Sequence, residues 1–306
     1  MSEIITYTAC PFCKSDNIIK VLTAKDNTVS QKDFDIWHCN NCSGRFTQHI
    51  PGQEDIGAYY KSNDYISHSD VKKGFINRLY HIVRNYTLQS KKKLLNQVNN
   101  NSKGALLDIG AGTGAFANTM KLDGWQVTAL EPDDVARENA LKNYGLQLQT
   151  PDTLYNLPEN SFNVITMWHV LEHVHDLHGY IDTFHRILES NGTLIIAVPN
   201  YTSYDAEKYG QYWAAYDVPR HLYHFSPDCM QRLMQSHGFT VTNYIPMWFD
   251  SFYVSMLSEQ YKNGKSNMVG AVSTALASNR KAWVDAKKCS SVIYVIKKAQ
   301  SPKPKA

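Results

Sequence analysis

The chain has 306 residues, 43% hydrophobic and 19% charged, which is enough for one large domain or two smaller ones. Lysine and arginine total 31 against 28 acidic residues, a formal net charge of +3. This weak excess argues against a dedicated nucleic-acid-binding protein, and no run reaches the roughly 18 to 20 apolar residues of a membrane span. The first ten residues contain neither a basic segment nor an apolar core, so no secretory signal is predicted and the expected compartment is the cytoplasm.

Residues 1–50 contain four of the six cysteines, in two C-x-x-C pairs. The pairs are Cys10 with Cys13 and Cys39 with Cys42, and 25 residues separate them. Two such turns can bring four thiolates around one Zn²⁺, and the separation leaves room for the β-hairpin of a zinc ribbon. Because thiolates take all four positions, the metal would be structural. Iron in the same site remains an alternative, whereas a redox disulfide is disfavoured because neither pair opens a helix of a βαβ unit.

Residues 51–102 are predicted to form a helical cap or linker. Apolar residues recur at helical spacing between positions 71 and 98, and a polar run at 96–102 ends the pattern. An aromatic segment at 59–68 precedes the helix. Two interpretations of this segment remain open, namely that it closes over a cofactor or that it is one packing face of a helix.

From residue 103 onwards, short apolar strands alternate with helices of about ten residues, which indicates βαβ units. We predict an α/β domain at 103–299 with a doubly wound, mostly parallel, seven-stranded sheet. Its last two strands are expected at 240–245 and 291–296, separated by a polar helical insertion at about 248–288. The tail at 300–306 is predicted to be disordered.

The most specific motif follows the first strand of this domain. It has the spacing G-x-G-x-G, at Gly110, Gly112 and Gly114, between a predicted strand and a predicted helix. Asp108 adds a carboxylate beside the loop. Its negative charge would repel a pyrophosphate but attract an ammonium group. Glu131 ends the next predicted strand, where a carboxylate can accept both hydroxyls of a ribose. The pattern therefore favours a ligand with an amino group and a ribose over a dinucleotide.

This combination resembles the class I methyltransferases, from residue 103 to about 200 and on to the last two strands. The resemblance implies a Rossmann-like sheet closed by an antiparallel hairpin, with S-adenosylmethionine as the methyl donor. Asn163 departs from the family pattern, in which an aspartate is commoner. An ordinary glycine turn and a nicotinamide-dependent dehydrogenase are the alternatives. The cofactor-binding residues that the resemblance implies are Asp108, Gly110, Ala111, Gly112, Gly114, Glu131, Pro132, Thr153, Leu154, Trp168 and His169.

Histidines are frequent after the fourth predicted strand of the domain. His169 and His173 have the i, i+4 spacing that could share a metal on a helix, but the H-E-x-x-H motif is absent. We therefore expect these side chains to line the cofactor cleft.

The segment 213–226 follows the fifth predicted strand, at the edge of the sheet where doubly wound enzymes act. We expect His221 or His224 to act as the general base that deprotonates the methyl acceptor, because an imidazole titrates near neutral pH. The alternative is a structural cluster in which Arg220 pairs with Asp217. More loosely, the segment resembles part of the sugar C-methyltransferases, which also carry an N-terminal four-cysteine zinc domain. Their acid–histidine pair is absent here, since Arg220 precedes His221.

Three hypotheses of function follow. The first is a methyltransferase for a small molecule, with a sugar or nucleotide sugar as a candidate acceptor. The second is an RNA- or protein-modifying methyltransferase that holds its substrate with the zinc ribbon, and the third is a binding module with a vestigial cofactor site. Basic and acidic residues are interspersed in the ribbon, and the glycine loop is intact, which favours the first hypothesis. The acceptor atom and the oligomeric state are not predicted.

Overall fold

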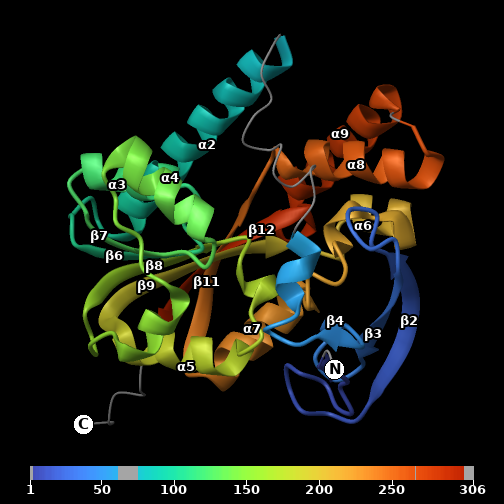
Figure 1. The fold of residues 1–306 in the computed structure, drawn as a ribbon, viewed down its shortest axis with the longest axis horizontal. Helices are drawn as coiled ribbons and strands as arrows, with labels where there is room; N and C mark the ends of the chain where they lie inside the picture. Colours follow the sequence, from blue (N-terminus) through green and yellow to red (C-terminus); the bar gives the residue numbers. More distant parts are fainter. Residues whose placement is uncertain (1–2, 61–74, 266, 300–306) are drawn as a thin grey trace.

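The structure is a computed structural model that describes residues 3–60, 75–265 and 267–299. Its centre is a six-stranded sheet in the order β11-β12-β9-β8-β6-β7, with helices on both faces (Figure 1). Strands β7, β6, β8 and β9 run parallel, and β12 and β11 close one edge as antiparallel neighbours. The doubly wound, mostly parallel sheet is therefore confirmed. Its strands are β6 (Ala105–Ile109), β7 (Gln126–Leu130), β8 (Phe162–Trp168), β9 (Leu188–Pro199), β11 (Phe239–Pro246) and β12 (Ser291–Lys298).

The central sheet has six strands instead of the expected seven, and β7 is its edge strand. A single parallel bridge joins Leu130 to Gln149, and the 3-10 helix η2 (Pro151–Asn156) follows it. Pro151 has no backbone N–H to donate to a strand ladder, and its fixed φ suits the first position of a helical turn. Thr153 and Leu154, two of the residues expected to bind the cofactor, therefore lie in a helical turn beside β7.

The helices cover the two faces of the sheet, and the side chains of its strands alternate between two hydrophobic layers. In β8, Ile165 and Met167 belong to the core that includes α5 and α7, whereas Val164 belongs to the core that includes α2 and α3. Figure 1 shows α3 and α4 above the sheet and α5 and α7 below it. The helices are α2 (Phe75–Val98), α3 (Ala115–Leu122), α4 (Asp134–Tyr144), α5 (Leu177–Ile187), α6 (Tyr204–Tyr209), α7 (Pro227–Ser236), α8 (Asp250–Asn263) and α9 (Met268–Val284).

Local signals in the sequence set several helix ends. Gly145 ends α4 in the left-handed region, with a φ of 62°, and Ser226 begins α7 by accepting a hydrogen bond from the N–H of Cys229. Both residue types are common at these positions of a helix. Helices α8 and α9 lie between β11 and β12, within the predicted insertion. No helix in the part of the chain that the structure describes is both long enough and apolar enough to cross a membrane.

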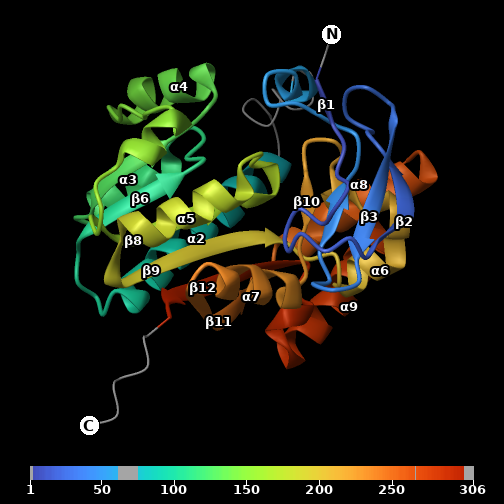
Figure 2. The same cartoon turned by 90° about the horizontal axis from the view of Figure 1, so that it is seen from below.

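The N-terminal cysteine-containing segment forms two small sheets. In the first, β1 (Ile4–Ile5) pairs with β5 (Ile50–Pro51). The second has the order β10-β4-β3-β2, and its strand β10 comes from the segment expected to face the acceptor. Figure 2 shows β10, β3 and β2 at one end of the central sheet, and β4 lies between β10 and β3. The strands of the second sheet are β2 (Ile18–Lys25), β3 (Asp33–Cys39), β4 (Arg45–Thr47) and β10 (Tyr223–His224).

Side-chain packing also joins the cysteine-containing segment to the α/β domain. The backbone N–H of Thr47 donates to the carbonyl of Leu222 at 2.9 Å, and the Thr47 hydroxyl donates to the carbonyl of His221 at 2.7 Å. The ring of Phe12 packs edge-on against Phe225, with centroids 5.5 Å apart. One hydrophobic core therefore extends from the cysteines to the central sheet.

Truncating Phe225 tests whether the two parts unfold together. Phe225 is fully buried, so Phe225→Ala should lower the free energy of unfolding by about 3–5 kcal/mol. Because the core is shared, circular dichroism and the reactivity of the cysteine thiols should report one urea transition, shifted by the same amount. Phe249→Ala, at a 40% exposed position, is the control and should change stability by only about 0.5 kcal/mol. Two separate transitions would show that the parts are independent.

Candidate cofactor and acceptor site

The glycine loop connects β6 to α3 at the edge where the parallel strands end. Gly110, Gly112 and Gly114 all have positive φ, at 69°, 54° and 78°. A Cβ on Gly110 would also lie 2.3 Å from the side chain of Val170, so any other residue there would displace Val170 in addition to adopting an unfavourable φ. Ala111, between the first two glycines, donates its N–H to the carbonyl of Leu130 and so ties the loop to β7. The loop is held in a conformation that leaves an open backbone surface for a ligand.

Two buried carboxylates flank this loop. Asp108 in β6 is 1% exposed and accepts a hydrogen bond from the hydroxyl of Thr166 at 2.7 Å, and burial raises its pKa to about 7. Glu131, directly after β7, accepts hydrogen bonds from the N–H groups of Gly112 at 2.7 Å and Asp133 at 3.0 Å. Burial also raises the pKa of Glu131. The structure thus brings both predicted acids to the same edge of the sheet.

The other residues expected around the cofactor lie near this edge. Pro132 is exposed directly after Glu131, whereas Leu154 in η2 is buried in the hydrophobic core. Trp168 ends β8 and packs edge-on against Phe116 of α3, with ring centroids 5.5 Å apart. These side chains can form the walls of a cleft, and their contacts with a cofactor remain predictions.

Lys91 is a residue of the site that the sequence did not indicate. Helix α2 places its ammonium group 4.2 Å from the centre of the Trp168 ring. Burial lowers the pKa of Lys91 to about 8, while Asp108 and Asp250 favour its charged form. Three lysines follow one another at 91–93, and the sequence does not show which of them lies in the site. The packing of α2 on the sheet decides this.

His169 adopts a φ of 58° and directs both ring nitrogens toward carboxylates. Its Nε2 lies 2.9 Å from Oδ2 of Asp250, and its Nδ1 lies 3.5 Å from Oε1 of Glu172. Burial opposes a charge on this imidazole, but the two carboxylates outweigh it and raise the pKa of His169 to about 10. The charged ring therefore links α8 to the loop after β8.

The two histidines expected to act as a base have different surroundings. His224 is 3% exposed within β10, and its Nε2 lies 3.1 Å from the hydroxyl of Thr47 in the cysteine-containing segment. Burial lowers the pKa of His224 well below its usual value. His221 instead faces Glu172 and His173, with ligand-type atoms of all three residues within 4.8 Å of one another.

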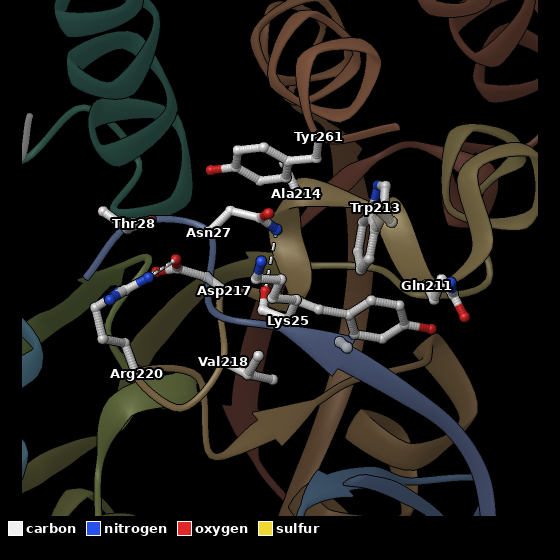
Figure 3. A pocket seen from close by; sticks show the side chains of 12 residues that line it. Lys25, Asn27, Thr28, Gln211, Trp213, Ala214, Asp217, Val218, Arg220 and Tyr261 are labelled. Carbon is white, nitrogen blue, oxygen red and sulfur yellow. Dashed lines mark hydrogen bonds and ion pairs between the residues drawn. The ribbon is translucent and has the colours of Figure 1, made fainter. Parts of the chain in front are cut away.

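Arg220 makes the structural contacts that the alternative interpretation of this segment expected. Its guanidinium donates to both carboxylate oxygens of Asp217, at 2.5 and 3.0 Å, and lies 3.3 Å from Asp26 (Figure 3). The neighbouring hollow, which Tyr261 of α8 also lines, has a volume of about 10 Å³, room for roughly one water molecule. The Arg220 cluster therefore fixes the loop and does not form a binding cavity.

The four predicted metal ligands form one cluster in the N-terminal segment. The Sγ atoms of Cys10 and Cys42 are 3.5 Å apart, those of Cys13 and Cys39 are 3.6 Å apart, and all four lie within 4.8 Å of one another. Sulfurs at about 2.3 Å from a tetrahedral Zn²⁺ would lie roughly 3.8 Å apart. None of the six cysteines forms a disulfide. The cluster therefore fits a four-thiolate metal ion.

The strand order is that of the class I, S-adenosylmethionine-dependent methyltransferases. Residues 79–244, more than half of the chain, match the family described as a methyltransferase domain, and the chain belongs to this family. The matched residues include the glycine loop, Glu131 and His221 but none of the four clustered cysteines.

Similar proteins include the ubiquinone biosynthesis O-methyltransferase of Rickettsia prowazekii, 30% identical over 42% of this chain and 52% of the relative. An uncharacterized methyltransferase of Staphylococcus carnosus is 28% identical over 44% of this chain and 65% of the relative. Among solved structures, a SAM-dependent methyltransferase of Thermotoga maritima, titled as a possible histamine N-methyltransferase, has a TM-score of 0.42. It is 24% identical and covers 56% of this chain and 79% of its own. The chain spans about half the length of the first curated relatives that it matches.

Proposed function

We propose that this protein transfers a methyl group from S-adenosylmethionine to a hydroxyl group of a small molecule. The observation that carries the proposal is the position of Asp108 and Glu131 on either side of the glycine loop, both buried and both at the edge where the parallel strands end. Glu131 would accept hydrogen bonds from the ribose hydroxyls, and Asp108 would attract the amino group of the methionine part. Membership of the methyltransferase domain family supports this assignment.

When bound, S-adenosylmethionine supplies a methyl group on a positively charged sulfur, which leaves as a neutral thioether and needs no proton. An acceptor hydroxyl, by contrast, must lose its proton as the bond from its oxygen to the methyl carbon forms. We place that event near His221, because this side chain lies beyond the ends of β8 and β9 and joins Glu172 and His173 in one cluster. Trp168 and Phe116 would exclude water from the methyl-donor side.

Two features support a small acceptor. One of the relatives named above is a ubiquinone biosynthesis O-methyltransferase, and the resemblance of the acceptor segment to sugar C-methyltransferases adds a sugar or nucleotide sugar as a candidate. The cysteine-containing segment packs its strand β4 against β10, so this edge is not free to hold a macromolecule. The intact loop and carboxylates are inconsistent with a vestigial site.

We also propose that Cys10, Cys13, Cys39 and Cys42 hold a structural Zn²⁺. Each pair closes a turn of the same kind, since Lys14 and Ser43 donate their N–H groups to the carbonyls of Cys10 and Cys39 and both have positive φ. Four thiolates complete the coordination of the ion, so no position remains for a substrate.

Replacing Glu131 tests the cofactor assignment. Glu131→Ala should weaken S-adenosylmethionine binding about 10- to 100-fold, because a hydrogen bond to a charged group contributes roughly 1.5–3 kcal/mol. Glu138→Ala, which removes an exposed glutamate from α4, is the matched control and should leave the affinity unchanged. Isothermal titration calorimetry measures both. Unchanged binding by the Glu131 variant, or tighter binding of NADH than of S-adenosylmethionine, would contradict the proposal.

The two histidines of the acceptor segment provide a second test. His221→Ala should reduce methyl transfer by roughly 10²- to 10⁴-fold and leave S-adenosylmethionine affinity within about twofold. His224→Ala should lower the thermal stability and retain most of the turnover per folded molecule, because His224 contacts Thr47 in the cysteine-containing segment. The assay follows transfer of a radiolabelled methyl group to a panel of phenols and nucleotide sugars. Equal turnover of the wild-type protein and the His221 variant would exclude a role for His221 at the acceptor.

A further inference from the structure

Glu172, His173 and His221 form a compact cluster that the transfer of a methyl group does not by itself require. Glu172 and His173 lie in the 3-10 turn η3 (Leu171–His173) after β8, and His221 directly precedes the segment that leads into β10. One potential ligand atom from each residue lies within 4.8 Å of the other two. The rings of His173 and His221 meet edge to face, with centroids 4.6 Å apart.

The carboxylate of Glu172 lacks the partners that a buried charge needs. The side chain is fully buried, and neither of its oxygens has a hydrogen-bond partner among the residues that the structure describes. Its nearest cationic group, Nδ1 of His169, is 3.5 Å away, too far for a good hydrogen bond, and this imidazole is shared with Asp250 at 2.9 Å. A buried carboxylate in this condition is costly unless a further cation compensates it.

The two histidines have the tautomer that leaves a lone pair for such a cation. Nδ1 of His173 lies 3.0 Å from the carbonyl oxygen of Arg220 and 2.9 Å from the hydroxyl oxygen of Tyr60, and Nδ1 of His221 lies 2.9 Å from the carbonyl oxygen of Ala215. A carbonyl oxygen can only accept, and the Tyr60 hydroxyl can accept as well, so these contacts favour the proton on each Nδ1 and the lone pair on each Nε2. Hydrogen bonds from the remote nitrogen to backbone carbonyls are the usual way in which proteins orient metal-binding histidines.

We propose that Glu172, His173 and His221 bind a divalent first-row transition metal ion, of the group from Mn²⁺ to Zn²⁺. Two imidazole nitrogens and one carboxylate oxygen suit these ions better than Mg²⁺, which prefers oxygen ligands alone. The site is distinct from the four cysteines and, unlike them, supplies only three ligands. An ion held there keeps coordination positions open to oxygen donors.

The role of these open coordination positions in catalysis rests on the proposed function, the transfer of a methyl group to a hydroxyl. The hydroxyl oxygen of the acceptor would bind to the ion, which lowers the pKa of that hydroxyl. The O–H bond then breaks, with release of the proton to water. The oxygen forms its bond to the methyl carbon as the bond from that carbon to sulfur breaks. His221 thus acts on the acceptor as a ligand of the ion. His173 is partly exposed, which gives the ion a way in.

The experiment measures Mn²⁺ binding by the full-length protein, with its cysteine site filled by Zn²⁺ and loosely bound metal removed. Mn²⁺ binds thiolates poorly, so the cysteine cluster does not compete for it. Electron paramagnetic resonance of free Mn²⁺ should show one saturable site in the wild-type protein. Glu172→Gln and His221→Gln, which nearly preserve side-chain volume, should each weaken binding at least about 10-fold.

The matched control is His237→Gln, because His237 also has a carboxylate neighbour, Asp182, at 2.6 Å but lies outside the cluster. It should bind Mn²⁺ as the wild-type protein does, and circular dichroism should show all three variants folded. The proposal is overturned if the wild-type protein shows no saturable Mn²⁺ site, or if Glu172→Gln and His221→Gln bind Mn²⁺ with unchanged affinity. Calorimetry of S-adenosylmethionine on the same samples keeps the two proposals apart, since neither of these results alters cofactor binding.

Discussion

The pairing of β4 with β10 is the contact on which the acceptor side of this protein depends. It is short, because only Arg45 and Phe46 of β4 pair with residues of β10, and Thr47 adds hydrogen bonds to the carbonyls of His221 and Leu222. The pairing nevertheless fixes the backbone from His221 to His224. The first fifty residues have too little apolar surface to fold firmly alone, so a metal on the cysteines would stabilise β4 and, through it, the acceptor segment.

Buried carboxylates give the site its electrostatic character. Asp108, Glu131 and Glu172 all lie near the carboxyl ends of parallel strands, where water is largely excluded. Lys91 interacts with Asp108 and His169 with Glu172, both of these cations are shared with Asp250, and Arg137 interacts with Glu131. A site with more acids than bases attracts a positively charged ligand, which agrees with a sulfonium cofactor on one side and a metal ion on the other. The same excess of acids would disfavour a dinucleotide.

The sequence predicted those features that local patterns encode. Alternating strands and helices predicted the sheet, and the glycine spacing predicted the loop. The sheet has six strands instead of the expected seven, because Pro151 cannot continue a strand ladder beside β7. The spacing of the cysteines predicted their cluster, since each pair closes its own turn.

The features that the sequence did not reveal depend on contacts between distant segments. Strand β10 has two residues, and its partner lies more than 170 positions away. Helical spacing pairs His173 with His169 as possible metal ligands. The chain instead forms a 3-10 turn here, and the side chain of His173 lies next to His221. Lys91 enters the site only because α2 packs over Trp168. Spacing along the chain contains no information on such contacts.

The most direct test of this account is hydrogen–deuterium exchange of the full-length protein before and after removal of the metal from the cysteines. If the ion holds β4 and β4 holds the acceptor segment, exchange at the amides of 221–225 should accelerate together with that of β3 and β4. The amides of β6 and β8, which pair only within the central sheet, should remain protected. Unchanged exchange at 221–225 in the metal-free protein would contradict the account.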